Sequence, residues 1–250
     1  MNGVLDTPVL VVSVFVFLFL PIRPSWHACP HGVPQNEVMS TRTASGPLEP
    51  AQLADWYAVP PEAQGRTWVR GSFITTLDGR ATGPDGLSGG LNRGSAGDHA
   101  VFAHLREWAD VVVVGAGTIR AEGYGPLPRV NLVVVTRSGE VPEAVRARTA
   151  GDGEVVVVGG EGRPVSPEQV LDEVGRRGWH RVVVEGGPRL FAPWVEAGLV
   201  DELCVTVRPV LAGGDGPLLV PQDAGFGQLV GAATHVLTWD GDVLVRTRLR

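Results

Sequence analysis

The chain contains no lysine, and all 21 of its basic residues are arginines. This absence excludes a Schiff-base lysine and the lysine of a Walker A phosphate loop. Cysteine is nearly as scarce, because Cys29 and Cys204 are the only two. Two thiols cannot build a disulfide framework or a zinc site of paired cysteines. The six histidines lack metal-ligand spacing, so the sequence predicts no metal site.

Charge is also sparse. Charged residues make up 19% of the chain, apolar residues make up 44%, and the net charge is −6. This composition can bury a sizeable core and argues against disorder over most of the chain. An acidic balance argues against a nucleic-acid partner.

Long hydrophobic runs are limited to Val9 to Leu20. This run is shorter than the roughly 20 residues of a membrane-spanning helix, and its leader carries Asp6 and no basic residue. Three interpretations stay open: a weak signal or anchor, a disordered extension, or an upstream start codon that is not used. We favour the third, with the folded chain beginning near Met39. We therefore expect an extension over residues 1–38 and a single cytoplasmic domain over residues 39–250, with no membrane partner.

Two valine-rich stretches each end in a glycine turn. Val111 to Val114 is followed by Gly115-Ala116-Gly117-Thr118, and Val182 to Glu185 by Gly186-Gly187-Pro188. Runs of β-branched residues bounded by glycine are typical of parallel strands buried on both faces. Glycine lets backbone N–H groups approach an anion closely. The two turns therefore suggest one nucleotide bound across the carboxyl edge of a sheet.

The remaining pattern predicts an α/β fold. Further strands are expected over 67–76, 131–135 and 154–158, helices over 47–58, 95–109, 166–178 and 188–197, and a mobile glycine-rich loop over 83–97. Alternating strands follow over 202–210, 229–239 and 243–249, with Asp240-Gly241 as a hairpin turn. We expect one mixed, mostly parallel sheet with helices on both faces and an antiparallel finish.

Each candidate site residue has a structural alternative. Gly115-x-Gly117 lacks the third glycine of the dinucleotide fingerprint, since Arg120 stands there. Arg137 and Ser138 follow a predicted strand. There they can bind a ribose 2′-phosphate, or they can simply form a solvated turn. Asp78 lies in a turn, where aspartate is common for turn chemistry alone.

Two further residues belong to regular elements. Arg106 lies on a predicted helix, where a surface arginine is the simpler interpretation. Glu185 ends a buried strand, where an unpaired carboxylate is costly, and this favours a ligand-binding role.

Taken together, these segments resemble the reductase domain of the bifunctional riboflavin-biosynthesis protein, the pyrimidine reductases, whose fold is that of dihydrofolate reductase. The resemblance covers about residues 66 to 250. The matching segments are Thr76-Leu77-Asp78-Gly79, Leu105-Arg106 with Ala109-Asp110, Val114 to Thr118, Glu185 to Pro188, Gly198 to Leu203 and Pro209 to Gly214.

The resemblance implies a reduction that uses NADPH. The implied substrate is a ribosylamino-pyrimidinone 5′-phosphate, whose ribosyl group becomes ribityl when C1′, as an imine, accepts hydride. The turns and the resemblance together give a set of expected NADPH-binding residues: Thr76, Gly115, Gly117, Thr118, Glu122, Arg137, Gly186, Gly187, Pro188, Arg189 and Leu190.

The substrate side is expected to consist of Ser88, Arg106, Arg129 and Glu185, with the two arginines suited to phosphate. Asp78 is the candidate for relaying a proton to the amine product. The family often has Asp-Asp-Pro where this chain has Glu122-Gly123-Tyr124, and this departure bears on the substrate more than on the cofactor.

The zinc deaminase partner domain is not expected, because no H-x-E and no C-x-x-C occurs. Two other functions remain open: a reductase of dihydrofolate or another pterin, and a nucleotide-binding module without turnover. We also expect a homodimer formed through the antiparallel end of the sheet.

Overall fold

The computed structural model describes residues 41–147 and 149–250. The predicted extension of residues 1–38, including Cys29, and the proposed start at Met39 lie outside the described residues. No helix in the described ranges is both long and apolar enough to cross a membrane.

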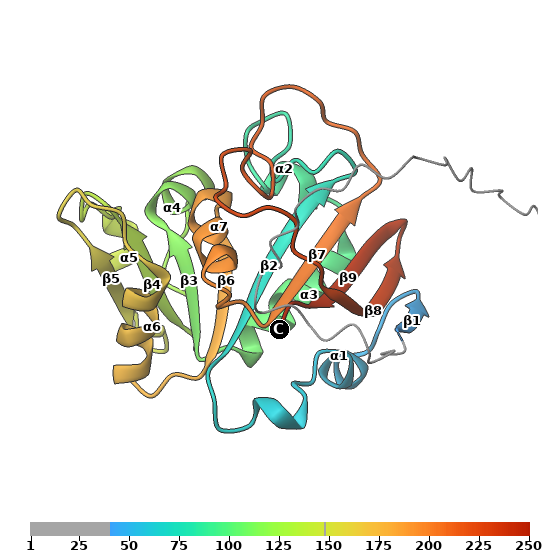
Figure 1. The fold of residues 1–250 in the computed structure, drawn as a ribbon, viewed down its shortest axis with the longest axis horizontal. Coiled ribbons are helices and arrows are strands. Elements are labelled where there is room, and N and C mark those ends of the chain that lie inside the picture. The colour runs from blue at the N-terminus through green and yellow to red at the C-terminus, as the bar shows by residue number, and fades with distance from the viewer. Residues whose placement is uncertain (1–40, 148) are drawn as a thin grey trace, which may run out of the picture. The chain divides into compact units, whose positions relative to one another are not determined.

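One nine-stranded sheet organises the described part of the chain, in the order β1-β8-β9-β7-β2-β6-β3-β4-β5 (Figure 1). The strands are β1 Arg42–Ser45, β2 Trp68–Thr76, β3 Val111–Gly115, β4 Asn131–Thr136, β5 Val155–Gly159, β6 Arg181–Gly186, β7 Glu202–Arg208, β8 Ala232–Trp239 and β9 Asp242–Arg248. Of these nine, β9 runs antiparallel to both of its neighbours, and every other pairing is parallel. The expected mixed, mostly parallel sheet is confirmed.

Helices cover both faces of this sheet, as expected. They are α1 Pro50–Trp56, α2 Gly89–Asn92, α3 Ala96–Trp108, α4 Ala116–Glu122, α5 Glu143–Arg146, α6 Pro167–Arg176 and α7 Pro188–Glu196, with a short 3-10 turn, η1, at Pro61–Ala63. The valines of β3 explain the two layers. Val112 and Val114 pack with residues of α1, α3, α4 and α5, whereas Val111 and Val113 pack with residues of α6 and α7. Successive residues of a strand point to opposite faces, so an unbroken valine run buries both.

The prediction of a single loop over residues 83–97 was wrong. Residues 83–97 are not one continuous loop, because α2 and the start of α3 lie within them. α2 has only four residues, too few to show an apolar period. The alternating strand β7 was assigned to the antiparallel end, and its antiparallel pairing with β9 confirms this assignment. On its other side β7 pairs parallel with β2, which the sequence pattern did not predict. Alternation of apolar and polar residues indicates a strand with one buried face, but it does not tell whether the strand pairs parallel or antiparallel with its neighbours. The hairpin at Asp240-Gly241 is confirmed between β8 and β9, with positive φ at both residues.

A buried ion cluster joins the centre of the sheet to α1. Arg70 on β2 donates to Glu202 on β7 at 2.8 Å, and Arg246 on β9 donates to the same carboxylate at 3.0 Å. Both guanidinium groups also donate to backbone carbonyls just after α1, including those of Tyr57 and Ala58. These three charged side chains are almost fully buried, and such groups persist only where partners satisfy them. The cluster therefore fixes three strands and one helix end relative to one another.

Candidate functional site

The two glycine turns lie side by side at the carboxyl edge of the sheet. β3 and β6 are hydrogen-bonded neighbours, so the turns that follow them meet. A Cβ atom added to Gly187 would lie 3.1 Å from Oγ1 of Thr118, and one added to Gly115 would lie 3.8 Å from the carbonyl oxygen of Gly186. Gly186 has a φ of +114°, which favours glycine. Backbone from two strands thus forms one surface that side chains would partly fill.

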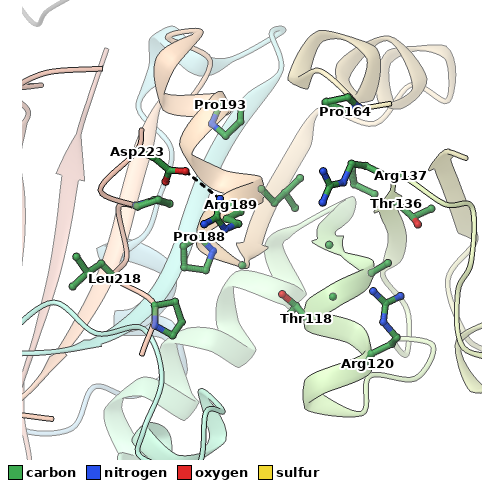
Figure 2. Close-up of a pocket in the computed structure, with 18 of the residues that line it drawn as sticks. Thr118, Arg120, Thr136, Arg137, Pro164, Pro188, Arg189, Pro193, Leu218 and Asp223 are labelled. Atoms are coloured by element: carbon green, nitrogen blue, oxygen red, sulfur yellow. Dashed lines mark hydrogen bonds and ion pairs between the residues drawn. The ribbon is translucent and has the colours of Figure 1, made fainter. Parts of the chain in front are cut away.

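A cleft of about 1220 Å³ opens over this surface (Figure 2). Thr118 and Arg137 lie on one side of it, and Pro188 and Arg189 lie on the other. Eight of the expected cofactor residues line this cleft: Gly115, Gly117, Thr118, Arg137, Gly187, Pro188, Arg189 and Leu190. The segment from Asp215 to Asp223 supplies further lining residues.

Positive charge is present along much of the first cleft. Arg137 follows β4, next to Thr136 and Ser138, which also line the cleft. Arg120 on α4 and Arg189 on α7 line it as well, and Arg189 pairs with Asp223 at 3.3 Å. Guanidinium groups bind phosphate through charge-assisted hydrogen bonds. The cleft therefore suits an elongated anionic ligand.

A second, smaller cleft of about 260 Å³ adjoins the first. The two clefts share five lining residues: Gly117, Thr118, Gly187, Pro188 and Pro217. Three residues from the expected site line the second cleft alone, namely Ser88, Glu122 and Glu185. Molecules bound in the two clefts would therefore meet at the glycine turns.

Glu122 connects the second cleft to the glycine-rich segment. Its Oε1 accepts the backbone N–H of Ser88 at 2.7 Å, at the start of α2. The sequence assigned Glu122 to the cofactor, whereas its side chain holds the wall of the second cleft.

Glu185 is bound by two neighbouring side chains. Arg106 donates to both of its carboxylate oxygens, at 2.7 and 2.6 Å, and the hydroxyl of Tyr124 donates at 2.9 Å. The Glu185 side chain is only 1% exposed. Burial and the Glu185 carboxylate together raise the pKa of Tyr124 above its ordinary value, so its hydroxyl keeps its proton. The guanidinium of Arg106 thus has a structural partner that sequence reasoning did not foresee.

The two arginines expected to bind phosphate line neither cleft. Arg106 forms the bidentate pair with Glu185, and its guanidinium stacks 4.1 Å from the ring of Phe102. Arg129 is exposed, in a turn where its φ is +63°. Their role in phosphate binding remains a prediction, and the two are placed very differently.

Asp78 and Thr76 form a turn that also lies outside both clefts. The Thr76 hydroxyl donates to Asp78 at 2.6 Å, and the backbone N–H groups of Ala212 and Gly213 donate at 3.0 and 2.8 Å. These donors, with Thr76 foremost, hold the pKa of Asp78 far below its ordinary value. A carboxylate so stabilised is a poor proton donor. Through these hydrogen bonds Asp78 holds the segment that follows β7 against the turn after β2.

Asp98 is a lining residue of the second cleft that sequence reasoning missed. It lies in the first turn of α3 and is 9% exposed. Burial raises the pKa of its carboxyl group. An acidic residue in the first turn is a common helix feature, so the sequence carried no distinct signal for it.

A family model described as the RibD C-terminal domain matches residues 67–245. The chain belongs to the RibD C-terminal domain family. Riboflavin biosynthesis protein RibD from two Mycobacterium tuberculosis strains is 27% identical over 217 residues, which is 83% of this chain and 58% of those proteins. This family member thus spans little more than half the length of the curated relatives it matches.

Solved structures share its fold. A pyrimidine reductase-like protein from Corynebacterium diphtheriae superposes with a TM-score of 0.63 at 21% identity, covering 79% of this chain and 98% of that one. A deaminase/reductase from Thermotoga maritima gives a TM-score of 0.59 at 19% identity, covering 74% of this chain and 57% of that one. At such identities the likeness establishes the architecture alone.

The different placement of Arg106 and Arg129 gives a test. Arg106→Ala removes the bidentate partner of a buried carboxylate, and we expect the free energy of unfolding to fall by about 3 kcal/mol. Arg129→Ala changes an exposed side chain and should alter it by less than about 0.5 kcal/mol. Urea unfolding of both variants measures the difference. Equal stabilities would contradict a structural role for the Arg106–Glu185 pair.

Proposed function

We propose that this chain is an NADPH-dependent reductase of riboflavin biosynthesis. Its substrate in this proposal is a ribosylamino-pyrimidinone 5′-phosphate, whose ribosyl group is reduced to ribityl. The observation that carries the proposal is the pair of clefts that meet at the two glycine turns. Membership of the RibD C-terminal domain family supports the same conclusion.

The residues of the first cleft fit a phosphorylated dinucleotide. The turns at Gly115 and Gly187 leave backbone accessible, and α7 begins at Pro188 with its positive end toward the cleft. Arg137 and Ser138 are suited to a ribose 2′-phosphate, which distinguishes NADPH from NADH. When bound, the nicotinamide supplies a hydride. The protein orients the two ligands and keeps water from the point where they meet.

Reduction of a pterin such as dihydrofolate is the second candidate. None of the described residues that line the second cleft is an arginine, and Arg106 and Arg129 lie outside it. A phosphorylated pyrimidine therefore has to place its phosphate beyond this cleft, whereas a pterin has no phosphate to place. A module that binds the nucleotide without turnover is the remaining alternative.

NADPH oxidation with a panel of substrates tests the function. We expect the full chain to oxidise NADPH with the pyrimidine 5′-phosphate, because the two clefts share the residues of the glycine turns and so bring both ligands together. The loss of nicotinamide absorbance measures this oxidation. Turnover with dihydrofolate alone would transfer the assignment to a pterin reductase. Binding of NADPH without turnover of either substrate would contradict a reductase.

Cofactor preference tests the first cleft separately. Arg137→Ala should weaken NADPH binding by about tenfold, the effect of about 1.4 kcal/mol, because one charge-assisted contact is lost. NADH binding should change little. Fluorescence titration of both dinucleotides measures this, with Arg146→Ala on α5, outside both clefts, as the matched control. An equal loss for NADPH and NADH would argue against a 2′-phosphate contact.

The antiparallel end of the sheet supports the proposal of a homodimer. Leu77, Val210, Leu211 and Val243 are exposed apolar residues, with Leu211 75% exposed. Leu77 and Val210 are hydrogen-bonded neighbours, and Val243 pairs with Val207 on β7. Contiguous exposed apolar residues are typical of interaction surfaces.

We propose that a second copy of the chain covers these residues. Light scattering should give twice the mass of one chain, and Leu211→Glu should shift the protein toward the monomer by placing a charge in the contact. Glu143→Arg on α5, toward the other end of the sheet in Figure 1, should leave the mass unchanged. A monomeric wild type would refute the dimer.

A further inference from the structure

Three carboxyl groups line the second cleft, and two of them already have strong donors. Glu185 accepts two hydrogen bonds from Arg106, and Glu122 accepts the backbone N–H of Ser88. Asp98 is also buried at the cleft, but its hydrogen-bond donor is the neutral hydroxyl of Thr206, and no arginine is bound to it in the described structure. A carboxyl group in such surroundings favours its neutral, protonated form.

The neighbours of Asp98 reinforce this difference. Asp242 on β9 accepts two hydrogen bonds from Arg208, at 3.0 and 2.8 Å, and one from the hydroxyl of Ser95. The same Ser95 oxygen accepts the backbone N–H of Asp98 at 3.3 Å, so the two acidic residues share one serine. Asp242 is thus held by a guanidinium group, whereas no arginine is bound to Asp98 in the described structure. A carboxyl group without a cationic partner is the one whose neutral form a second, neighbouring carboxyl group favours.

Several groups act on the pKa of Asp98 in opposite directions. Burial is the largest cause and raises it, and the negative charge of Asp242 raises it further. The hydroxyl of Thr206, His99 and Arg208 lower it, as does the positive end of α3. The net direction is upward. The other titratable groups that face Asp98 or its cleft are Tyr57, Glu122, Tyr124 and Glu185.

Another polar group of the same cleft belongs to Thr82. The hydroxyl oxygen of Thr82 is buried and makes no hydrogen bond there, and Thr82 lines the second cleft together with Asp98. A buried hydroxyl is usually satisfied, so this one is available to a ligand heteroatom. The second cleft thus has a buried acid, Asp98, and an unpartnered hydroxyl, that of Thr82, among its lining residues.

We propose that Asp98 is the proton donor of the reduction and acts on the nitrogen of a C=N bond held in the second cleft. This inference rests on the proposed function. The carbon of the C=N bond receives the hydride, and the π electron pair moves to the nitrogen. The nitrogen takes the proton of the Asp98 carboxyl group, which becomes a carboxylate. The substrate gains a C–H and an N–H bond, NADPH is oxidised to NADP⁺, and water returns a proton to Asp98. The same step serves the imine of a ribosylamine and the C=N bond of a dihydropterin.

The pH dependence of Asp98→Asn tests the proposal in the full chain. In the wild type, kcat should fall as the pH rises through the pKa of Asp98, because the donor must be protonated. Asp98→Asn keeps the size of the side chain but carries no acidic proton. We expect kcat to fall by about 100-fold, and we expect kcat no longer to decline as the pH rises through the wild-type pKa of Asp98. NADPH affinity, measured by fluorescence titration, should remain that of the wild type. Asp172→Asn on α6 is the matched control and should behave as the wild type.

Asp242→Asn provides a second variant with a different expected result. Removing the neighbouring negative charge lowers the pKa of Asp98. The decline of kcat with rising pH should therefore occur at lower pH, while the variant still turns over substrate. The role of Asp98 would be overturned if Asp98→Asn kept the wild-type kcat and its decline at high pH. It would also be overturned if that decline occurred at the same pH in Asp242→Asn as in the wild type.

Infrared spectroscopy of the protein without ligands separates this inference from the proposed function. A protonated carboxyl band should persist above the pH at which exposed aspartates ionise, and it should be missing in Asp98→Asn. If the wild type turns over no substrate, the reductase assignment fails whatever the spectrum shows. If the wild type is active but the band is absent, Asp98 is not the proton donor.

Discussion

The close approach of two backbone turns is the constraint on which the rest of the site depends. β3 and β6 are adjacent parallel strands, and each ends in glycine at the same edge of the sheet. Gly187 lies so close to Thr118 that a Cβ atom would be 3.1 Å from its hydroxyl. The turns therefore act as one surface, and both clefts open from it. A bulkier residue in either turn would separate the strands' ends or block the cleft.

Charge is distributed unequally between the two clefts. The first has arginines from α4, α7 and the end of β4. The second is lined by acidic and neutral side chains, and Arg106, which does not line it, is bound to its residue Glu185. An elongated anion is therefore favoured in the first cleft, while the second can hold a carboxyl group in its neutral form. In the proposed reaction, this asymmetry places a phosphorylated cofactor and a proton donor at the same face of the protein.

Arginine also serves the fold itself. The chain has no lysine, and the ion pairs found among the described residues all use the planar guanidinium of arginine. The Arg70–Glu202–Arg246 cluster shows the advantage, because each guanidinium donates both to the Glu202 carboxylate and to a backbone carbonyl just after α1. Such forked donors satisfy buried acceptors that a single ammonium could not reach together.

The sequence alone determined the sheet's central strands, the helices on both faces and the glycine turns. Valine runs bounded by glycine carry a local signal, since burial on both faces requires apolar side chains at every position. Eight of the expected cofactor residues line the first cleft; seven of them lie in or beside those turns, and Arg137 follows β4. Strand direction at the antiparallel end, the helix α2 and the partner of Arg106 were decided by tertiary structure. The tertiary structure also decided the environment of Asp98, because its neighbours Thr206 and Asp242 lie on strands more than a hundred residues away along the chain. A pattern within one segment reports its own burial, whereas the protonation of a carboxyl group depends on charges that only folding brings to it.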